Sequence, residues 1–335
     1  AEPCHGAQPL TVKILVIEPY YGGSHRTFLQ GLQHHLPYEF DLMTLPARKW
    51  KWRMRLAAPY FADQINSLHP EKTYDLILCS SFVDVATFRS LLDECYQKIP
   101  VYTYFHENQF AYPDRRDQPR SEPGVVSLYG ALAADRVIFN SAWNRDSFLR
   151  GAADFLQQMP DAVPAGITES IAAKSGVIPV PLEAHWYPGE AQGAGHNGPL
   201  TIVWNHRWEY DKAPERLFAA LLKLHEAGVD FRVHVVGQQF RKQPPVFAEM
   251  QTRLQTHIGQ WGMVEDDANY RQLLRQSHVV LSTALHEFQG LAVLEAVASG
   301  CVPVVPKRLC YPDYFPAECC YASFPDDAAR ESDMI

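Results

Sequence analysis

The sequence predicts an α/β protein with two doubly wound domains that face a central cleft. Short apolar runs alternate with helix-length segments, and the alternation stops once, in a stretch rich in proline and glycine, before it starts again. Continuous apolar runs of this kind are typical of parallel strands covered on both faces of a sheet. A length of 335 residues also favours two hydrophobic cores over one.

The first half of the chain contains six expected strands, over residues 12–17, 40–45, 76–80, 101–105, 136–140 and 176–179. Helices are expected from about Ser24 and over residues 60–68, 85–96 and 142–156. The first strand leads into Gly22 and Gly23, and a loop without side chains at these positions lets a ligand approach its backbone. This loop lacks a full G-x-G-x-x-G pattern, so it is no dinucleotide fingerprint.

Residues 183–199 carry prolines and glycines without periodicity, as a linker does. We therefore expect domains at 1–185 and 200–335, joined by residues 186–199. In the second domain, strands are expected over 200–204, 231–236, 279–282 and 302–305, and helices over 214–227, 246–261 and 268–276. Ligands of such sheets bind in the loops that follow the strands.

Composition excludes several classes of protein. No leader-like segment opens the chain and no apolar run reaches membrane-spanning length, so we expect a soluble, cytoplasmic protein that does not contact a membrane. Seven cysteines without a C-x-x-C pair argue against a disulfide framework or a structural zinc site. A net charge of −8 argues against a protein whose whole surface coats nucleic acid, although it permits a local basic patch.

Two cations follow the expected strand at 200–204. Arg207 and Lys212 lie just before Pro214 opens a helix, and together with the N–H groups of a helix start they suit a diphosphate. The alternative is an exposed turn in which these cations pair with Glu209 or Asp211.

Two carboxylates follow the expected strand at 279–282. With helix geometry from about Gln289, Glu287 precedes the helix and Glu295 lies two turns inside it, so both can face one cleft and bind sugar or ribose hydroxyls. Gly290 lets a phosphate approach the backbone. The alternative is a capping glutamate and a solvated one.

A basic segment in the first domain combines five cations with two tryptophans: Arg48, Lys49, Trp50, Lys51, Trp52, Arg53 and Arg55. Cations contact phosphates and indoles stack on unpaired bases, which is how single-stranded RNA is often bound. Arg115 and Arg116 extend this segment in a later loop. The alternative is a solvated loop or helix whose tryptophans pack on the core.

No metal site is expected. The adjacent pairs Asp266-Asp267 and Asp326-Asp327 read as helix caps or solvated turns, and Arg207 and Lys212 already supply positive charge.

The spacing R-x4-K at Arg207 and Lys212, and E-x7-E at Glu287 and Glu295, resembles glycosyltransferase family 4, whose GT-B fold has two Rossmann-like domains. The chain is more closely similar to the tRNA-queuosine alpha-mannosyltransferase family, in residues 18–25 (EPYYGGSH), 106–110 (HENQF), 139–144 (FNSAWN) and 205–212 (NHRWEYDK). The resemblance implies a retaining transferase that moves mannose from GDP-mannose to queuosine in a tRNA anticodon, without a cofactor.

The resemblance also implies roles for single residues. Arg207 and Lys212 neutralise the leaving diphosphate, Glu287 holds sugar hydroxyls, Glu295 holds the ribose, and His106 reaches the sugar from the first domain. The donor site further includes Gly22, Gly23, Gly237, Gln289, Gly290 and Leu291. The acceptor site includes Ser24, His25, Glu107, Asn108 and Gln109 beside the basic segment. His106, Glu107 and His25 are the candidate proton carriers.

Other functions fit parts of these patterns. A family 4 enzyme with another nucleotide sugar and a small-molecule or lipid acceptor would bind its acceptor with little salt dependence. A GT-B nucleotide-sugar epimerase would consume donor without acceptor, and a non-catalytic RNA-binding or sugar-nucleotide-sensing protein would bind without turnover. Residues 326–335 are too few for the crossing helix that commonly ends the GT-B fold, so we expect looser domain coupling or a missing helix.

Overall fold

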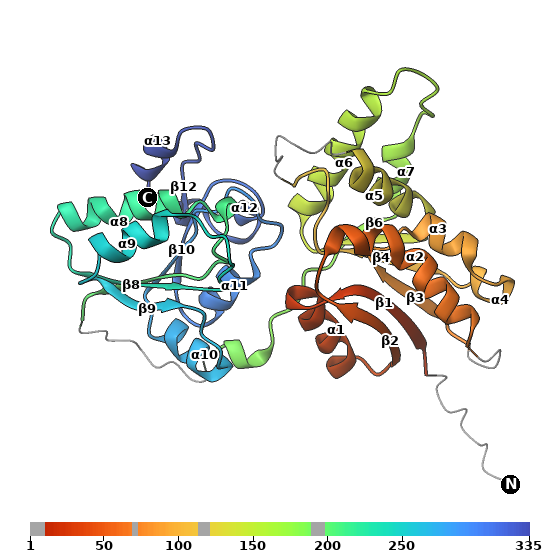
Figure 1. Cartoon of the computed structure of the whole chain (residues 1–335), viewed down its shortest axis with the longest axis horizontal. Helices are drawn as coiled ribbons and strands as arrows, with labels where there is room; N and C mark the ends of the chain where they lie inside the picture. The colour runs from red at the N-terminus through yellow and green to blue at the C-terminus, as the bar shows by residue number, and fades with distance from the viewer. Residues whose placement is uncertain (1–10, 69–72, 113–120, 189–197) are drawn as a thin grey trace, which may run out of the picture. The chain divides into compact units, whose positions relative to one another are not determined.

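The computed structural model describes residues 11–68, 73–112, 121–188 and 198–335. It divides into two compact units, Ala1–Pro181 (the N-terminal unit) and Leu182–Ile335 (the C-terminal unit). Each unit contains a six-stranded sheet whose paired strands all run parallel (Figure 1). Arg115 and Arg116 lie outside the described residues.

The sheet of the N-terminal unit has the strand order β2-β1-β3-β4-β5-β6. Its strands are β1 (Lys13–Tyr21), β2 (Glu39–Pro46), β3 (Leu76–Ser80), β4 (Val101–Phe105), β5 (Arg136–Phe139) and β6 (Ser175–Val177). Because β2 lies on one side of β1 and β3 on the other, the direction of winding reverses between β1 and β3. The carboxyl ends of the strands at such a reversal are where doubly wound sheets bind ligands.

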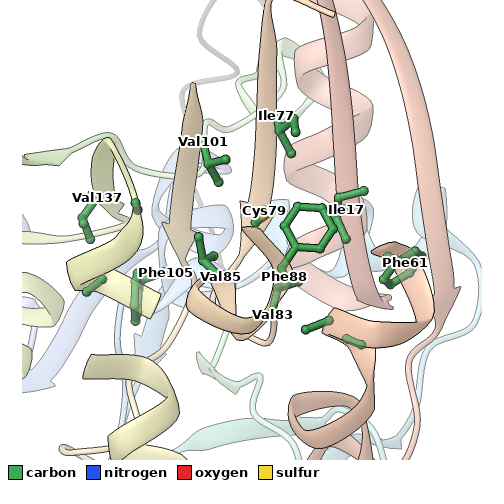
Figure 2. Close-up of a cluster of buried hydrophobic side chains, with 14 of the residues drawn as sticks. Ile17, Phe61, Ile77, Cys79, Val83, Val85, Phe88, Val101, Phe105 and Val137 are labelled. Atoms are coloured by element: carbon green, nitrogen blue, oxygen red, sulfur yellow. The ribbon is translucent and has the colours of Figure 1, made fainter. Parts of the chain in front are cut away.

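The helices of this unit are α1 (Gly23–His35), α2 (Trp50–Asn66), α3 (Val85–Leu91), α4 (Glu94–Gln97), α5 (Ser121–Ala133), α6 (Ala142–Gln157) and α7 (Ile167–Ala173). One core lies between the sheet and several of these helices, and Figure 2 shows side chains such as Ile17, Phe61, Phe88 and Phe105 gathered in it.

Helix α1 covers the opposite face of this sheet. Successive side chains of a strand point to opposite faces, and Leu15 and Ile17 belong to the core that contains Phe61 and Phe88. Glu18 therefore points to the other face. Phe28 of α1 stacks on Tyr104 of β4 there, with ring centroids 4.0 Å apart.

The sheet of the C-terminal unit has the order β12-β11-β10-β7-β8-β9. Its strands are β7 (Leu200–Trp204), β8 (Phe231–Val236), β9 (Ile258–Gly262), β10 (Val279–Leu281), β11 (Val302–Pro306) and β12 (Cys320–Tyr321). The winding reverses between β7 and β10, so the loops after these two strands form the expected ligand site of this unit.

The helices of the C-terminal unit are α8 (Pro214–Glu226), α9 (Val246–Arg253), α10 (Asp267–Arg275), α11 (Leu291–Ala298), α12 (Tyr311–Tyr314) and α13 (Ala328–Ser332), with single 3-10 turns η1 (Ala184–Trp186), η2 (Tyr210–Lys212) and η3 (Ala317–Cys319). Trp204, Trp208 and Phe247 are central to its core. No helix in the described ranges has the length and apolar character that a membrane span needs.

Two expectations about elements were wrong. The helix expected over 246–261 ends at Arg253, and residues 258–262 form the edge strand β9, whose largely exposed residues give no continuous apolar run. The helix expected from residue 60 begins at Trp50 and contains most of the basic segment. The units divide after Pro181, and η1 packs on the C-terminal unit, where the hydroxyl of Ser299 donates to the carbonyl of Trp186 at 3.3 Å.

A buried ion cluster fixes α13 to α8. Glu331 is fully buried and accepts from Arg308 at 2.5 and 2.9 Å, while Arg216 lies 2.6 Å from the same carboxylate. Burial would raise the pKa of Glu331, but the hydrogen bond and charge of Arg308 lower it overall. Helix α13 therefore belongs to the C-terminal unit and is held there by buried ion pairs.

Replacing Glu331 by Gln is expected to lower the free energy of unfolding by about 3 kcal/mol, because it leaves two buried guanidinium groups without their anion. Urea denaturation measures this loss. Asp333→Asn is the matched control: Asp333 pairs with Lys223 on the surface, so that change should cost less than about 1 kcal/mol. Equal costs for both changes would contradict the structural role of the cluster.

Candidate active site

A buried ion pair lies at the reversal of the C-terminal sheet. The Nζ atom of Lys212, after β7, lies 3.1 Å from Oε2 of Glu287, after β10. It also donates to the carbonyl of His286 at 2.7 Å and lies 3.4 Å from Oδ2 of Asp211. The Lys212 side chain is 6% exposed and that of Glu287 is 22% exposed. The sequence placed these two residues in one site, and the structure brings them together.

Both members of this pair are held in their charged forms. Burial would lower the pKa of Lys212, but the charges of Glu287 and Asp211 raise it overall. Burial would raise the pKa of Glu287, yet Lys212 lowers it to about 2. A fixed cation beside a fixed anion suits a ligand that carries phosphate and hydroxyl groups next to each other.

Hydrogen bonds tie the two loops of the site together. The N–H of Leu285 donates to the carbonyl of Asp211 at 2.8 Å, and the hydroxyl of Thr283 donates to the carbonyl of Lys212 at 2.7 Å. The indole N–H of Trp204 donates to the hydroxyl of Thr283 at 3.1 Å. Lys212 is thus positioned by the core, which limits the reorganisation that a reaction would require.

Arg207 differs from Lys212 in its exposure. Its side chain is 49% exposed and its Nη1 lies 3.2 Å from Glu209. The alternative of an exposed turn with a local ion pair therefore describes Arg207 in this structure. A surface pair of this kind is weak, so the guanidinium can reorient toward an incoming phosphate.

Two glycines of the predicted donor site have backbones that other residues would strain. Gly237 has φ +142°, and a Cβ atom there would lie 2.0 Å from the carbonyl oxygen of His206. Gly290 has φ +74° and caps α11, and a Cβ there would lie 3.0 Å from the ring of Tyr311. Gln289 is buried beside Gly290, and Leu291 begins the helix.

Glu295 lies in the second turn of α11, because the helix begins at Leu291 and not at residue 289 as expected. Burial raises the pKa of Glu295 to about 7, the charge of Asp267 adds to the rise, and a hydrogen bond with Tyr270 opposes it. The Asn205 amide donates to the Tyr270 hydroxyl at 2.9 Å and to the carbonyl of Ala292 at 2.7 Å. Glu287 and Glu295 are therefore held by separate sets of partners.

Sequence reasoning missed several polar residues of this site. Asn205 and His206 directly follow β7, and His206 Nε2 lies 3.0 Å from the hydroxyl of Ser282, which lies 2.7 Å from that of Tyr311. Burial lowers the pKa of His206 to about 3, and the charge of Lys212 adds to this effect. Asn205 and His206 follow β7 and Ser282 follows β10, and these positions after strands could have indicated a role in the site.

A second polar cluster lies at the reversal of the N-terminal sheet. His25, in the first turn of α1, contacts the carboxylate of Glu18 at 2.9 Å through Nδ1. Its ring stacks on that of His106, which follows β4, with centroids 3.9 Å apart and planes inclined by 25°. The sequence placed His25 in the acceptor site and His106 in the donor site. The structure brings both histidines together with Glu18, a residue that was not predicted from the sequence.

The remaining predicted acceptor residues divide by exposure. Ser24 and Glu107 are half-buried, whereas Asn108 and Gln109 are buried. The Asn108 amide donates to the side chains of Asn144 at 2.8 Å and Ser147 at 3.0 Å. Asn108 is thus committed to holding its own loop, and its direct contact with an acceptor stays a prediction.

The turn before α1 is tightly packed. Gly22 precedes α1, and a Cβ atom there would lie 2.6 Å from the Cβ of Ala47. Gly23 has φ +52° and open space around it. Only Gly23 therefore leaves room beside the backbone for a ligand.

The basic segment forms the first turns of α2 and the residues before it. Trp52 is 57% exposed, while Trp50 is half-buried and stacks toward Phe82. Arg55 makes a bidentate ion pair with Glu122 at 2.6 and 2.7 Å, and Arg53 is half-buried and donates to the carbonyl of Pro46. The exposed residues of the segment are Arg48, Lys49, Lys51, Trp52 and Arg55, of which Arg55 is paired with Glu122.

One aspartate of each pair considered as a metal ligand is a helix N-cap. The Asp266 carboxylate accepts from the N–H of Asn269 at the start of α10, and that of Asp327 accepts from the N–H of Arg330 at the start of α13. Glu18, His25 and His106 bring three atoms that can ligate a metal within 4.8 Å of one another. The absence of a catalytic metal stays a prediction.

Comparison with known proteins identifies both parts of the chain. Residues 13–182 match the family model described as tRNA-queuosine alpha-mannosyltransferase N-terminal, and residues 191–318 match glycosyl transferases group 1. The chain is 36% identical over 320 residues to the tRNA-queuosine alpha-mannosyltransferase of Drosophila melanogaster, which covers 92% of this chain and 83% of the relative.

Solved structures agree in fold. HepE from Anabaena, in complex with UDP, has a TM-score of 0.64 at 15% identity and covers 97% of this chain and 88% of its own. A UDP-forming alpha,alpha-trehalose-phosphate synthase from Burkholderia xenovorans has a TM-score of 0.60 at 16% identity and covers 97% of this chain and 90% of its own. The chain is therefore a glycosyltransferase of GT-B fold that belongs to the tRNA-queuosine alpha-mannosyltransferase family.

Proposed function

We propose that this protein transfers mannose from GDP-mannose to the queuosine nucleoside of a tRNA anticodon, with retention of configuration and without a metal. The buried Lys212–Glu287 pair at the reversal of the C-terminal sheet is the observation that carries this proposal. The relative with 36% identity supports both the sugar and the acceptor. Free thiols at the six cysteines in the described ranges fit a cytoplasmic protein.

In the proposed reaction, Lys212 and Arg207 neutralise the diphosphate as its bond to the sugar breaks. In the transition state the sugar resembles an oxocarbenium ion and negative charge develops on the leaving diphosphate. Cations that stabilise this negative charge lower the barrier to transfer. The ionised Glu287 accepts hydrogen bonds from sugar hydroxyls, and Glu295 accepts them from the ribose. The departing phosphate oxygen takes the proton of the attacking hydroxyl, so no protein base is needed, and the acceptor attacks the sugar directly without a protein nucleophile.

The test is incorporation of labelled mannose from GDP-mannose into tRNA that contains or lacks queuosine. Transfer only to the queuosine-containing tRNA, lost in Glu287→Ala, would establish donor, acceptor and site. Transfer to neither tRNA, with folded protein and intact substrates, would contradict the proposal.

For the acceptor, we propose that Trp52 stacks on an unpaired base while Lys49 and Lys51 contact phosphates. Trp52→Ala is expected to weaken tRNA binding about tenfold, because stacking on one base contributes about 1–3 kcal/mol. Replacing Lys49 and Lys51 by Ala should instead flatten the dependence of log K on log salt by about 1.5. Fluorescence anisotropy at several salt concentrations measures both effects.

Lys98→Ala is the control for this experiment, because Lys98 is exposed at the C-terminal end of α4 and pairs with Glu94. Its tRNA affinity should equal that of the wild type. If Trp52→Ala also leaves the affinity unchanged, α2 is an ordinary solvated helix.

Donor binding should depend on pH through Glu295, whose pKa is about 7. A protonated Glu295 must lose its proton before it accepts bonds from both ribose hydroxyls, so GDP-mannose affinity is expected to fall about tenfold from pH 8 to pH 6. Calorimetry at these pH values measures the change. Glu295→Gln should bind more weakly at pH 8 and remove the dependence; an unaltered dependence would assign the titration to another group.

A further inference from the structure

The carboxylate of Glu18 is buried and accepts three hydrogen bonds. Oε1 accepts from the N–H of Tyr20 at 2.7 Å and from the hydroxyl of Ser80 at 3.2 Å, and Oε2 accepts from Nδ1 of His25 at 2.9 Å. The side chain of Glu18 is 3% exposed and that of His25 is 5% exposed. These three donors occupy both oxygens of the carboxylate, and a carboxylate in a buried position is best stabilised by a positive partner.

The surroundings of His25 favour its positively charged form, which makes it the partner of Glu18. Its ring stacks on the rings of His106 and Phe82, with ring centroids 3.9 Å and 5.5 Å away, and the plane of Phe82 is inclined by only 9°. Aromatic faces attract a cation. Burial would lower the pKa of His25, but the charge and hydrogen bond of Glu18, with a contribution from Glu107, raise it overall.

The surroundings of His106 instead favour its neutral form. It is 6% exposed, and its Nδ1 is buried without a hydrogen-bond partner among the described residues. Burial, together with the charge of His25, holds its pKa well below the usual range. The ring stays neutral, so each of its nitrogens has one defined role, donor or acceptor.

We infer that Glu18 is a positioning residue for the transfer reaction: it holds His25 as an imidazolium, and this cation fixes His106 as a neutral ring that hydrogen-bonds a substrate hydroxyl. The inference rests on the proposed function. The cluster lies at the carboxyl ends of β1, β3 and β4, where the sheet reverses and a ligand is expected. The hydroxyl belongs either to the transferred sugar or to the acceptor.

Among the described residues, other titratable groups also lie near His25 or its partner Glu18. Glu107 faces it from the loop after β4, Tyr20 packs on it edge to face at 5.8 Å, and the Cys79 thiol on β3 lies near Glu18. Burial, with the charge of Glu18, raises the pKa of Cys79, so this thiol stays neutral. Glu18 is thus the main anion that can sustain the charge on His25.

A bound metal ion is the competing explanation. An ion would need the in-plane lone pairs of both imidazoles to meet at about 2.1 Å from each nitrogen. Rings that stack 3.9 Å apart at 25° hold these lone pairs in two separate, nearly parallel planes, which hinders their meeting at one ion, and Oε1 of Glu18 already accepts from Tyr20 and Ser80. The geometry of Glu18, His25 and His106 therefore favours a proton on His25 over a metal ion bound by the three residues.

The direct test is an NMR titration of histidine ring nitrogens in the full-length protein, with His25 assigned by its loss in His25→Gln. The His25 pKa should lie above the ordinary value of about 6.5 in the wild type and fall below it in Glu18→Gln. This measurement needs no substrate, so it stands even if mannosyl transfer is never observed. An unshifted His25 in Glu18→Gln, or stoichiometric metal in the purified protein that Glu18→Gln loses, would overturn the inference.

Kinetics test the consequence for the reaction. Because His25 is needed in its charged form, Glu18→Gln should lose about tenfold in kcat at pH 8 and less at pH 6, so the alkaline limb of its profile moves to lower pH. GDP affinity should stay unchanged, since GDP binds the C-terminal unit. A raised KM for GDP-mannose assigns the hydroxyl to the sugar, and a raised KM for tRNA assigns it to the acceptor.

Asp41→Asn is the matched control, because Asp41 is a half-buried carboxylate of the same unit that accepts from Tyr74 at 2.6 Å. Its pH profile should equal that of the wild type. If Glu18→Gln does not fold, His25→Gln replaces it and should flatten the alkaline limb. A wild-type profile in whichever variant folds would overturn the inference.

Discussion

Lys212→Ala should lower kcat for mannosyl transfer by about 10³-fold, the largest loss expected for any single substitution in this protein. The Nζ atom of Lys212 is the buried cation of the C-terminal site, and no other described lysine or arginine lies within 4.0 Å of Glu287. In the proposed mechanism, its loss removes the charge that stabilises the leaving diphosphate. Single-turnover measurements with labelled GDP-mannose give this rate without interference from product release.

The same substitution leaves Glu287 buried without its cation, so thermal unfolding must be measured beside the rate. Lys212→Arg separates the two effects, because it keeps the positive charge but changes its geometry. Lys223→Ala, on the exposed face of α8, is the control and should leave kcat unchanged. If folded Lys212→Ala keeps its rate within threefold, the diphosphate role is wrong.

Strands were well predicted where the chain forms continuous apolar runs. Residues 200–204 and 231–236 were placed with their observed limits, because both strands are central and buried. The two edge strands of the C-terminal sheet lack this signal, which is why β9 was predicted as helix and β12 was not predicted at all. The strand orders, and hence the two reversal points, depend on pairing between distant segments that no local pattern records.

The site followed a similar rule. Arg207, Lys212, Glu287 and Glu295 could be proposed from their spacing and from the family resemblance, and the structure brings Lys212 and Glu287 together. The sequence could not show that Arg55 is committed to Glu122, because these residues lie 67 positions apart. It also could not show that Glu18 and His25 meet His106, since that contact requires β1, α1 and β4 to be assembled.

Replacing Glu287 by Gln is expected to lower kcat/KM about 10²-fold while leaving GDP affinity nearly unchanged. The substitution keeps the shape of the side chain but removes the anion that we propose to bind sugar hydroxyls. Lys212 remains charged, because Asp211 still lies 3.4 Å from its Nζ. Binding of GDP-mannose should therefore weaken relative to GDP, whereas Lys212→Ala should weaken both, and calorimetry with the two ligands separates these patterns.

The double variant tests whether the pair acts as a unit. If Lys212 and Glu287 stabilise neighbouring parts of one transition state, removing either disturbs the other, and Lys212→Ala with Glu287→Gln should lose little more activity than Lys212→Ala alone. Additive losses in the logarithm of kcat/KM would mean that the two residues act independently. The 3.1 Å contact would then serve folding of the site, and the sugar hydroxyls would be held by other groups.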